Sequence, residues 1–111
     1  MFSKFRNLIF KIDPEIAHNL AIKSLKLNIT TNIFDENKKD PMFETILFGK
    51  KINNPIGLAA GFDKNAEVYN SIFKLGFGFV EVGTVTPLKQ YGNPKPRVFR
   101  LAEDQALINR L

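Results

Sequence analysis

The chain has 111 residues, of which 44% are hydrophobic and 24% are charged, a composition typical of a soluble globular domain rather than of a disordered chain. It contains no cysteine and one histidine, which excludes disulfides, thiolate metal sites and cysteine nucleophiles and argues against a zinc site. The net charge of +5 suits either an anionic partner or a merely solvated basic surface, and no apolar run approaches the roughly 18 residues that span a bilayer.

The N-terminal segment predicts two amphipathic helices. In the first helix, basic residues occupy one side. The other side carries apolar residues that recur at helical spacing, namely Phe2, Phe5, Leu8, Ile9 and Ile12. Asp13 and Pro14 predict the start of a second helix over about 14–27, because aspartate caps a helix and proline suits its first position. The segment lacks the apolar core and cleavage site of a secretory signal. We therefore expect the chain to begin on the cytoplasmic side of any membrane that it touches.

The polar segment from Asn28 to Pro41 predicts a surface linker, so we divide the chain into domains 1–40 and 41–111. Residues 43–48 and 50–53 then predict a small hairpin that turns at Gly49, although the turn lacks an Asn-Gly signature.

The pattern after the hairpin is strand, helix and strand. It predicts a strand over 56–60, a helix over 66–75 that Gly76 closes, and a two-sided apolar strand over 79–85. Such a unit is right-handed and parallel. After a proline-rich loop, residues 98–101 are predicted to pair locally. Because two parallel strands leave their faces and edges open, the α/β chain is predicted to begin a larger parallel-sheet protein.

The tip of the first predicted strand carries candidate chemistry. Ala59, Ala60 and Gly61 have minimal side chains, so a flat ring could lie directly against the backbone. Lys64 supplies a compact charge that can reach an anionic group. A tight turn that simply needs small residues would show the same pattern. Thr84, at the tip of the second strand, adds a hydroxyl group that is a weak signal alone.

Four motifs together resemble the quinone-dependent (class 2) dihydroorotate dehydrogenases, over nearly the whole chain and in the right order. They are residues 13–18, residues 54–64, residues 76–87, and residues 92–101 with 109–110. The resemblance implies the first part of a (β/α)8 TIM barrel, preceded by a two-helix amphipathic N-terminal extension. Soluble family members that use other electron acceptors lack this extension, so its presence implies a quinone that arrives from the membrane.

The resemblance also implies roles for single residues. The positions that match the FMN site are Ala59, Ala60, Gly61, Lys64 and Thr84. Those that match the dihydroorotate site are Lys64, Asn109, Arg110 and Leu111. Those that match the quinone tunnel are Ala17, His18, Ala21, Phe62, Leu75, Val98 and Arg100. Without the resemblance, His18 would be an ordinary helix residue and the apolar tunnel positions would simply be core. No serine of the chain matches the catalytic base, which is expected beyond Leu111.

The implied activity of the complete protein is oxidation of (S)-dihydroorotate to orotate, with FMN as cofactor and a membrane quinone as acceptor, in pyrimidine (UMP) biosynthesis. We expect peripheral association with the cytoplasmic face of the inner membrane, and neither a metal nor a nucleic-acid partner. The chain itself is expected to be an N-terminal fragment without activity alone. The alternative is a non-catalytic fragment that acts only as a helix pair at a membrane surface.

Overall fold

The computed structural model describes residues 2–29 and 40–111, so most of the predicted linker lies outside the described residues. The chain forms two compact units, one made of Met1–Leu20 with Thr86–Leu111 and the other of Ala21–Val85. These units do not coincide with the division at residue 40, because the first unit takes residues from both sides of it. The division by role into 1–40 and 41–111 stays a prediction.

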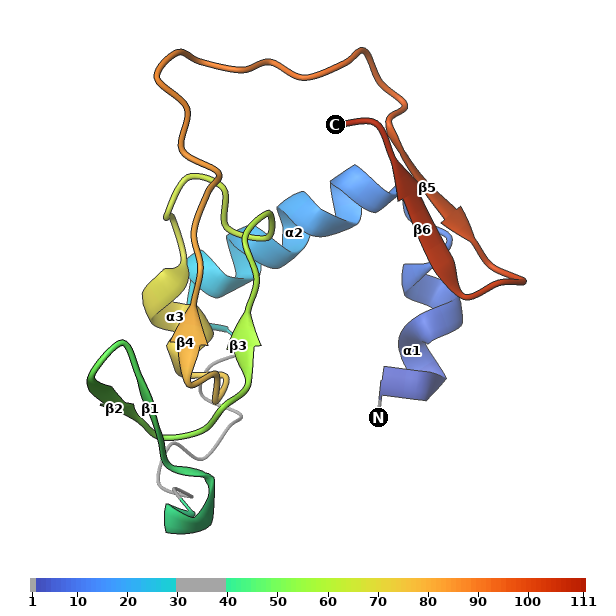
Figure 1. Cartoon of the computed structure of the whole chain (residues 1–111). Helices are drawn as coiled ribbons and strands as arrows, with labels where there is room; N and C mark the ends of the chain where they lie inside the picture. The colour runs from blue at the N-terminus through green and yellow to red at the C-terminus, as the bar shows by residue number, and fades with distance from the viewer. Residues whose placement is uncertain (1, 30–39) are drawn as a thin grey trace. The chain divides into compact units, whose positions relative to one another are not determined.

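Both helices expected in the N-terminal segment are present (Figure 1), α1 over Phe2–Ile9 and α2 over Pro14–Lys26. The carboxylate of Asp13 accepts hydrogen bonds from the backbone N–H groups of Glu15 (2.9 Å) and Ile16 (3.1 Å), which confirms the predicted cap. No helix within the described ranges is both long and apolar enough to cross a membrane. That these helices extend a barrel stays a prediction.

The first unit also contains a hairpin of β5 (Val98–Leu101) and β6 (Ala106–Asn109). The two strands are antiparallel, and Val98 lies opposite Asn109. This confirms that residues 98–101 pair locally. The partner strand β6 was not predicted, because its short run of apolar residues carries no alternation that distinguishes a strand.

The second unit begins with the predicted hairpin, made of β1 (Thr45–Leu47) and β2 (Lys50–Ile52) after a 3₁₀ turn (η2, Pro41–Phe43). Phe48 and Gly49 form its two-residue turn with φ of 48° and 74°. Positive φ at both positions is the conformation that matches the twist of a tight hairpin. The prediction is confirmed with an unusual residue, since phenylalanine takes the position at which Asn is common.

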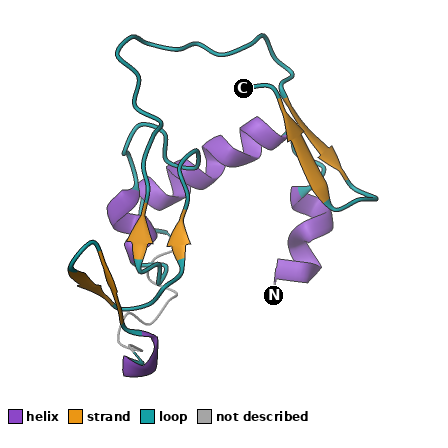
Figure 2. Ribbon diagram, in the orientation of Figure 1, coloured by secondary structure: helices purple, strands orange, loops and turns teal. Residues whose placement is uncertain are grey.

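Two parallel strands follow (Figure 2), β3 (Gly57–Leu58) and β4 (Phe79–Val80), with Gly57 opposite Phe79. Both are shorter than the predicted strands over 56–60 and 79–85. A side chain at Gly57 would collide with the Phe79 ring, so the glycine makes room for the aromatic residue. A side chain at Gly78 would collide with the backbone carbonyl of Asn54. Close packing at the start of this pair therefore requires glycine at the first residue of β3 and at the residue before β4.

Helix α3 (Tyr69–Phe73) connects the parallel strands. It starts later than the predicted 66, because Ala66 has a φ of 56° and lies outside the helical region. The N–H of Gly76, whose φ is 101°, donates to the carbonyl of Phe73 at 3.0 Å. Gly76 therefore closes the helix as predicted.

The core of this unit lies between the end of α2 and α3. It consists of Leu25, Val68 and Ile72, of which Ile72 is 0% exposed. The Ser71 hydroxyl donates to the carbonyl of Leu25 at 2.9 Å and so ties the two helices together. The residues that pack around the core are Ile22, Leu58, Phe62, Leu75, Phe77 and Val80. Two-sided burial of residues 79–85 is not observed within this chain, because Val85 is 82% exposed.

Candidate functional site

The tips of the two parallel strands are joined by backbone hydrogen bonds. The N–H of Gly61 donates to the carbonyl of Gly83 at 2.9 Å, and the N–H of Gly83 donates to the carbonyl of Asp63 at 3.2 Å. Both glycines have a φ above 100°, a region that other residues rarely adopt. The structure thus brings the predicted cofactor residues of the first strand next to Thr84, which follows Gly83.

This joined tip exposes backbone rather than large side chains. Ala59, Ala60 and Thr84 are exposed, and Gly61 is half-buried. At Gly61 no heavy atom lies within 4 Å of the position that a Cβ atom would take. The tip therefore leaves the main chain uncovered, so that a planar ring can rest against it.

Lys64 follows this tip in the sequence, three residues after Gly61, and is exposed. Within residues 2–29 and 40–111, no carboxylate forms an ion pair with its ammonium group. A cation that no protein acid neutralises is suited to pair with an anionic ligand.

The loop that carries Lys64 is held by Asp63, which is 2% exposed. Its two carboxylate oxygens accept the N–H groups of Glu67 and Val68, each at 2.8 Å. The turn that precedes α3 is thereby fixed to the strand tip. Our prediction gave Asp63 no role, because its amide partners lie four and five residues later, beyond the spacing of a helix cap.

Glu67, on the same loop, is paired with Lys26 of α2. The hydrogen bond from Lys26 lowers the pKa of Glu67 below its ordinary value of 4.5, and a hydrogen bond from Asn65 acts in the same direction. The pair is exposed, so it contributes to the site only by linking the loop to the helix.

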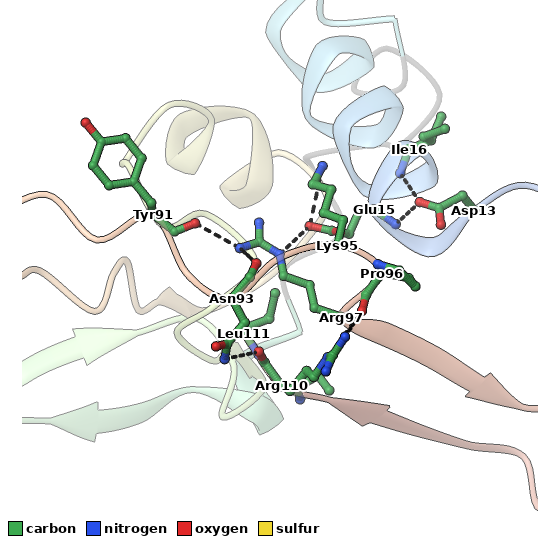
Figure 3. Close-up of polar contacts among 11 residues, drawn as sticks. Asp13, Glu15, Ile16, Tyr91, Asn93, Lys95, Pro96, Arg97, Arg110 and Leu111 are labelled. Carbon is green, nitrogen blue, oxygen red and sulfur yellow. Dashed lines mark hydrogen bonds and ion pairs between the residues drawn. The ribbon is translucent and has the colours of Figure 1, made fainter.

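The other predicted substrate residues belong to the first unit, where Asn109 ends β6 and Arg110 and Leu111 follow it (Figure 3). The N–H of Arg110 donates to the carbonyl of Arg97 at 2.8 Å, and Asn93 Nδ2 donates to the carbonyl of Arg110 at 2.7 Å. The Arg110 guanidinium donates to the carbonyl of Pro96 at 3.0 and 3.3 Å. Asn109 is exposed and accepts from the N–H of Leu111 at 3.4 Å. The proline-rich loop therefore holds this segment by its backbone.

Arg100 reaches the end of α1 within the same unit. Its Nη1 donates to the carbonyls of Phe10 (3.1 Å) and Ile12 (2.5 Å), and its guanidinium lies 4.9 Å from the centroid of the Phe10 ring. A cation is favourable at a helix C-terminus, where carbonyl groups lack partners. Sequence reasoning did not foresee this contact, which joins residues 88 positions apart.

The predicted tunnel residues are divided between the two units. Ala17, His18, Val98 and Arg100 belong to the first unit, and Ala21, Phe62 and Leu75 belong to the second. All seven are half-buried, and Phe62 and Leu75 pack against the core of their unit. The tunnel as a whole stays a prediction.

Comparisons with known proteins extend this description. A family model described as dihydroorotate dehydrogenase matches residues 42–111. A Rhodospirillum rubrum protein named dihydroorotate dehydrogenase (quinone) is 56% identical over 104 residues, which are 94% of this chain and 28% of the relative. A Rhizobium rhizogenes protein of the same name is 50% identical over 115 residues, covering 100% of this chain and 31% of the relative. The chain therefore spans about a third of the length of these relatives or somewhat less.

A solved structure is also similar. The ligand-free dihydroorotate dehydrogenase of Eimeria tenella superimposes with a TM-score of 0.80 at 50% identity, over 88% of this chain and 26% of that chain. The alternative of a membrane-binding helix pair receives no support, since the matches run through the strand segments as well as the helices. The match of the family model over more than half of the residues shows that this chain belongs to the dihydroorotate dehydrogenase family.

Proposed function

We propose that the chain is part of a quinone-dependent enzyme that oxidises (S)-dihydroorotate to orotate in pyrimidine biosynthesis. The observation that carries the proposal is the open glycine-rich strand tip beside Lys64, in a chain 50–56% identical to relatives named for this activity. The activity is assigned to the complete protein, of which this chain supplies the strand tips and the N-terminal helices.

The strand tip fits FMN. Ala59, Ala60 and Gly61 leave the backbone uncovered, and Thr84 adds an exposed hydroxyl group beside them. These residues would hold a planar ring by contact with the main chain and would orient it by hydrogen bonds. When bound, FMN supplies the two-electron redox chemistry between substrate and acceptor. The contribution of these residues is to position the ring.

Dihydroorotate carries a carboxylate, and the proposed partner for it is Lys64. The buried carboxylate of Asp63 fixes the loop from which Lys64 extends, so the ammonium group is positioned before the ligand arrives. A preorganised charge of this kind stabilises negative charge without a cost of reorganisation during the reaction. Asn109, at the end of β6, and the two residues after it, Arg110 and Leu111, are proposed to complete the substrate site.

The quinone is proposed to enter along the helices. Leu8 and Phe10 are exposed at the end of α1, and the basic residues Arg6 and Lys11 accompany them. An amphipathic helix with such a basic side suits an anionic membrane surface. We therefore propose peripheral association with the cytoplasmic face of the inner membrane. The tunnel is proposed to be lined by Ala17, His18, Ala21, Phe62, Leu75, Val98 and Arg100.

The test requires a full-length enzyme. The matching segment of the Rhodospirillum rubrum relative is replaced by this chain, and we call the product the chimera. We expect the chimera to reduce a soluble quinone analogue with dihydroorotate as donor. Lys64→Ala should slow this reaction by on the order of 100-fold, the scale of one preorganised electrostatic contact. Lys74→Ala, which removes another exposed lysine of the same unit, should have little effect.

Two results would count against the proposal. The first is a folded chimera that does not oxidise dihydroorotate under conditions in which the relative does. The second is a Lys64→Ala chimera with the activity of its parent, which would remove Lys64 from the substrate site.

A further inference from the structure

The predicted site leaves out Glu15 and Arg97, the most buried of the ion pairs found within the described residues. Arg97 Nε donates to Glu15 Oε1 at 2.9 Å, and the two side chains are only 18% and 15% exposed (Figure 3). Both residues belong to the same unit, although they are 82 positions apart in the sequence. A charge-assisted hydrogen bond with this degree of burial is stronger than a surface ion pair.

Arg97 uses a second guanidinium nitrogen to organise the proline-rich loop. Its Nη1 donates to the carbonyl of Tyr91 at 3.0 Å and to the carbonyl of Asn93 at 3.3 Å. Between them lies Gly92, with a φ of 72°, where any side chain would collide with Arg97 Nη1. The loop therefore lies around the guanidinium group of Arg97. This planar group donates to the carboxylate through Nε and to two loop carbonyls through Nη1.

The same loop holds the segment of residues 109–111. Arg110 is bound through its N–H to Arg97, through its carbonyl to Asn93 and through its guanidinium to Pro96. A continuous set of hydrogen bonds therefore runs from the carboxylate of Glu15 on α2, through Arg97, to the backbone of Arg110.

We propose that Glu15 and Arg97 are a positioning pair for the substrate-binding segment 109–111. This inference rests on the proposed function, in which that segment meets dihydroorotate. Neither residue touches the substrate in the proposal; the pair fixes the loop, and the loop fixes the segment. Lys95 Nζ also approaches Glu15 Oε1 at 3.7 Å. Its side chain is 63% exposed, so we do not count it as part of the positioning pair.

The test compares Glu15→Gln and Arg97→Lys with Lys95→Met in the chimera. Gln keeps the shape of Glu15 but removes its charge, and Lys keeps the charge of Arg97 but cannot bond the carboxylate and both carbonyls together. Each should raise the KM for dihydroorotate by about ten-fold, the effect of weakening one charge-assisted hydrogen bond. The KM for the quinone analogue should stay within about two-fold of the parent value, and Lys95→Met should leave both constants unchanged.

A second measurement is independent of activity. Amide hydrogen exchange of the peptides that cover residues 91–97 and 108–111 should accelerate in Glu15→Gln and Arg97→Lys, whereas peptides from the hairpin β1–β2 should keep their rates. An inactive parent chimera would overturn the proposed function, and the exchange rates would still decide whether Glu15 orders the segment. Unchanged exchange rates would overturn the inference, as would an accelerated exchange in an active chimera whose KM for dihydroorotate stays at the parent value.

Discussion

Replacement of the buried Asp63 should release the loop that presents Lys64. The carboxylate of Asp63 accepts two backbone N–H groups at 2.8 Å, and the N–H of Val68 is buried. A buried donor left without a partner costs about 1–3 kcal/mol, and this applies to Val68, since the N–H of Glu67 is only part-buried and can bond to water instead. For Asp63→Ala we therefore expect a local destabilisation of about 1–3 kcal/mol. Asp63→Asn keeps one acceptor oxygen, so its effect should be about half as large.

Amide hydrogen exchange in the chimera measures this effect at the residues concerned. A local free energy of about 1–3 kcal/mol corresponds to a loss of protection at Val68 of about 5-fold to 150-fold. Glu67→Gln is the matched control, because it neutralises an acid of the same loop that is exposed. It should leave the protection of Val68 nearly unchanged.

The reasoning would be refuted by an Asp63→Ala chimera whose Val68 amide keeps its protection. It would also be refuted if Glu67→Gln lowered this protection as much as Asp63→Ala did. In that case the exposed ion pair with Lys26, rather than the buried carboxylate, would hold the loop.

Three further predictions concern other parts of the chain. Arg100→Ala should raise the KM for the quinone analogue and leave the KM for dihydroorotate unchanged in steady-state assays, and the reverse pattern would contradict the assignment. Because Lys26 lowers the pKa of Glu67, their ion pair should stabilise the fold above about pH 4.5 and be lost as the pH falls through the folded-state pKa. An NMR titration of the Glu67 carboxyl group should show a midpoint below 4.5 that rises in Lys26→Met, and a parent midpoint at 4.5 would contradict this. Gly78→Ala should lower the melting temperature of the chimera, since the added carbon meets the backbone carbonyl of Asn54, and an unchanged value would show that the backbone can yield there.

Local signals in the sequence were sufficient for the elements that local chemistry determines. Asp13 and Pro14 predicted the start of α2, and Gly76 predicted the end of α3, because caps act on amides and carbonyls a few residues away. The lengths of the two parallel strands could not be predicted in the same way. An apolar run continues beyond Leu58, but the backbone turns at Gly61, and periodicity does not report φ.

The same limit applies to the candidate site. Small residues followed by Lys64 marked the strand tip, because a lack of side chains is visible in a sequence. The partners that hold the site were not visible, since Arg97 and Arg100 bond to groups 82 and 88 positions away. Nothing in the sequence around either arginine distinguishes a partner on α2 from one at the end of α1. Long-range pairs of this kind follow from the fold, and the fold had to be known first.

Gly57 and Phe79 lie opposite each other in the sheet, and side chains at the two positions would compete for the same space. The aromatic ring fills the space that a side chain on the opposite strand would need, so the size of either residue sets the size allowed to the other. Enlarging residue 57 alone should be poorly tolerated, whereas the same change together with a smaller residue at 79 should restore packing. In engineering this chain, the two positions should therefore be varied jointly, because libraries that vary them one at a time would miss combinations of a larger residue 57 with a smaller residue 79.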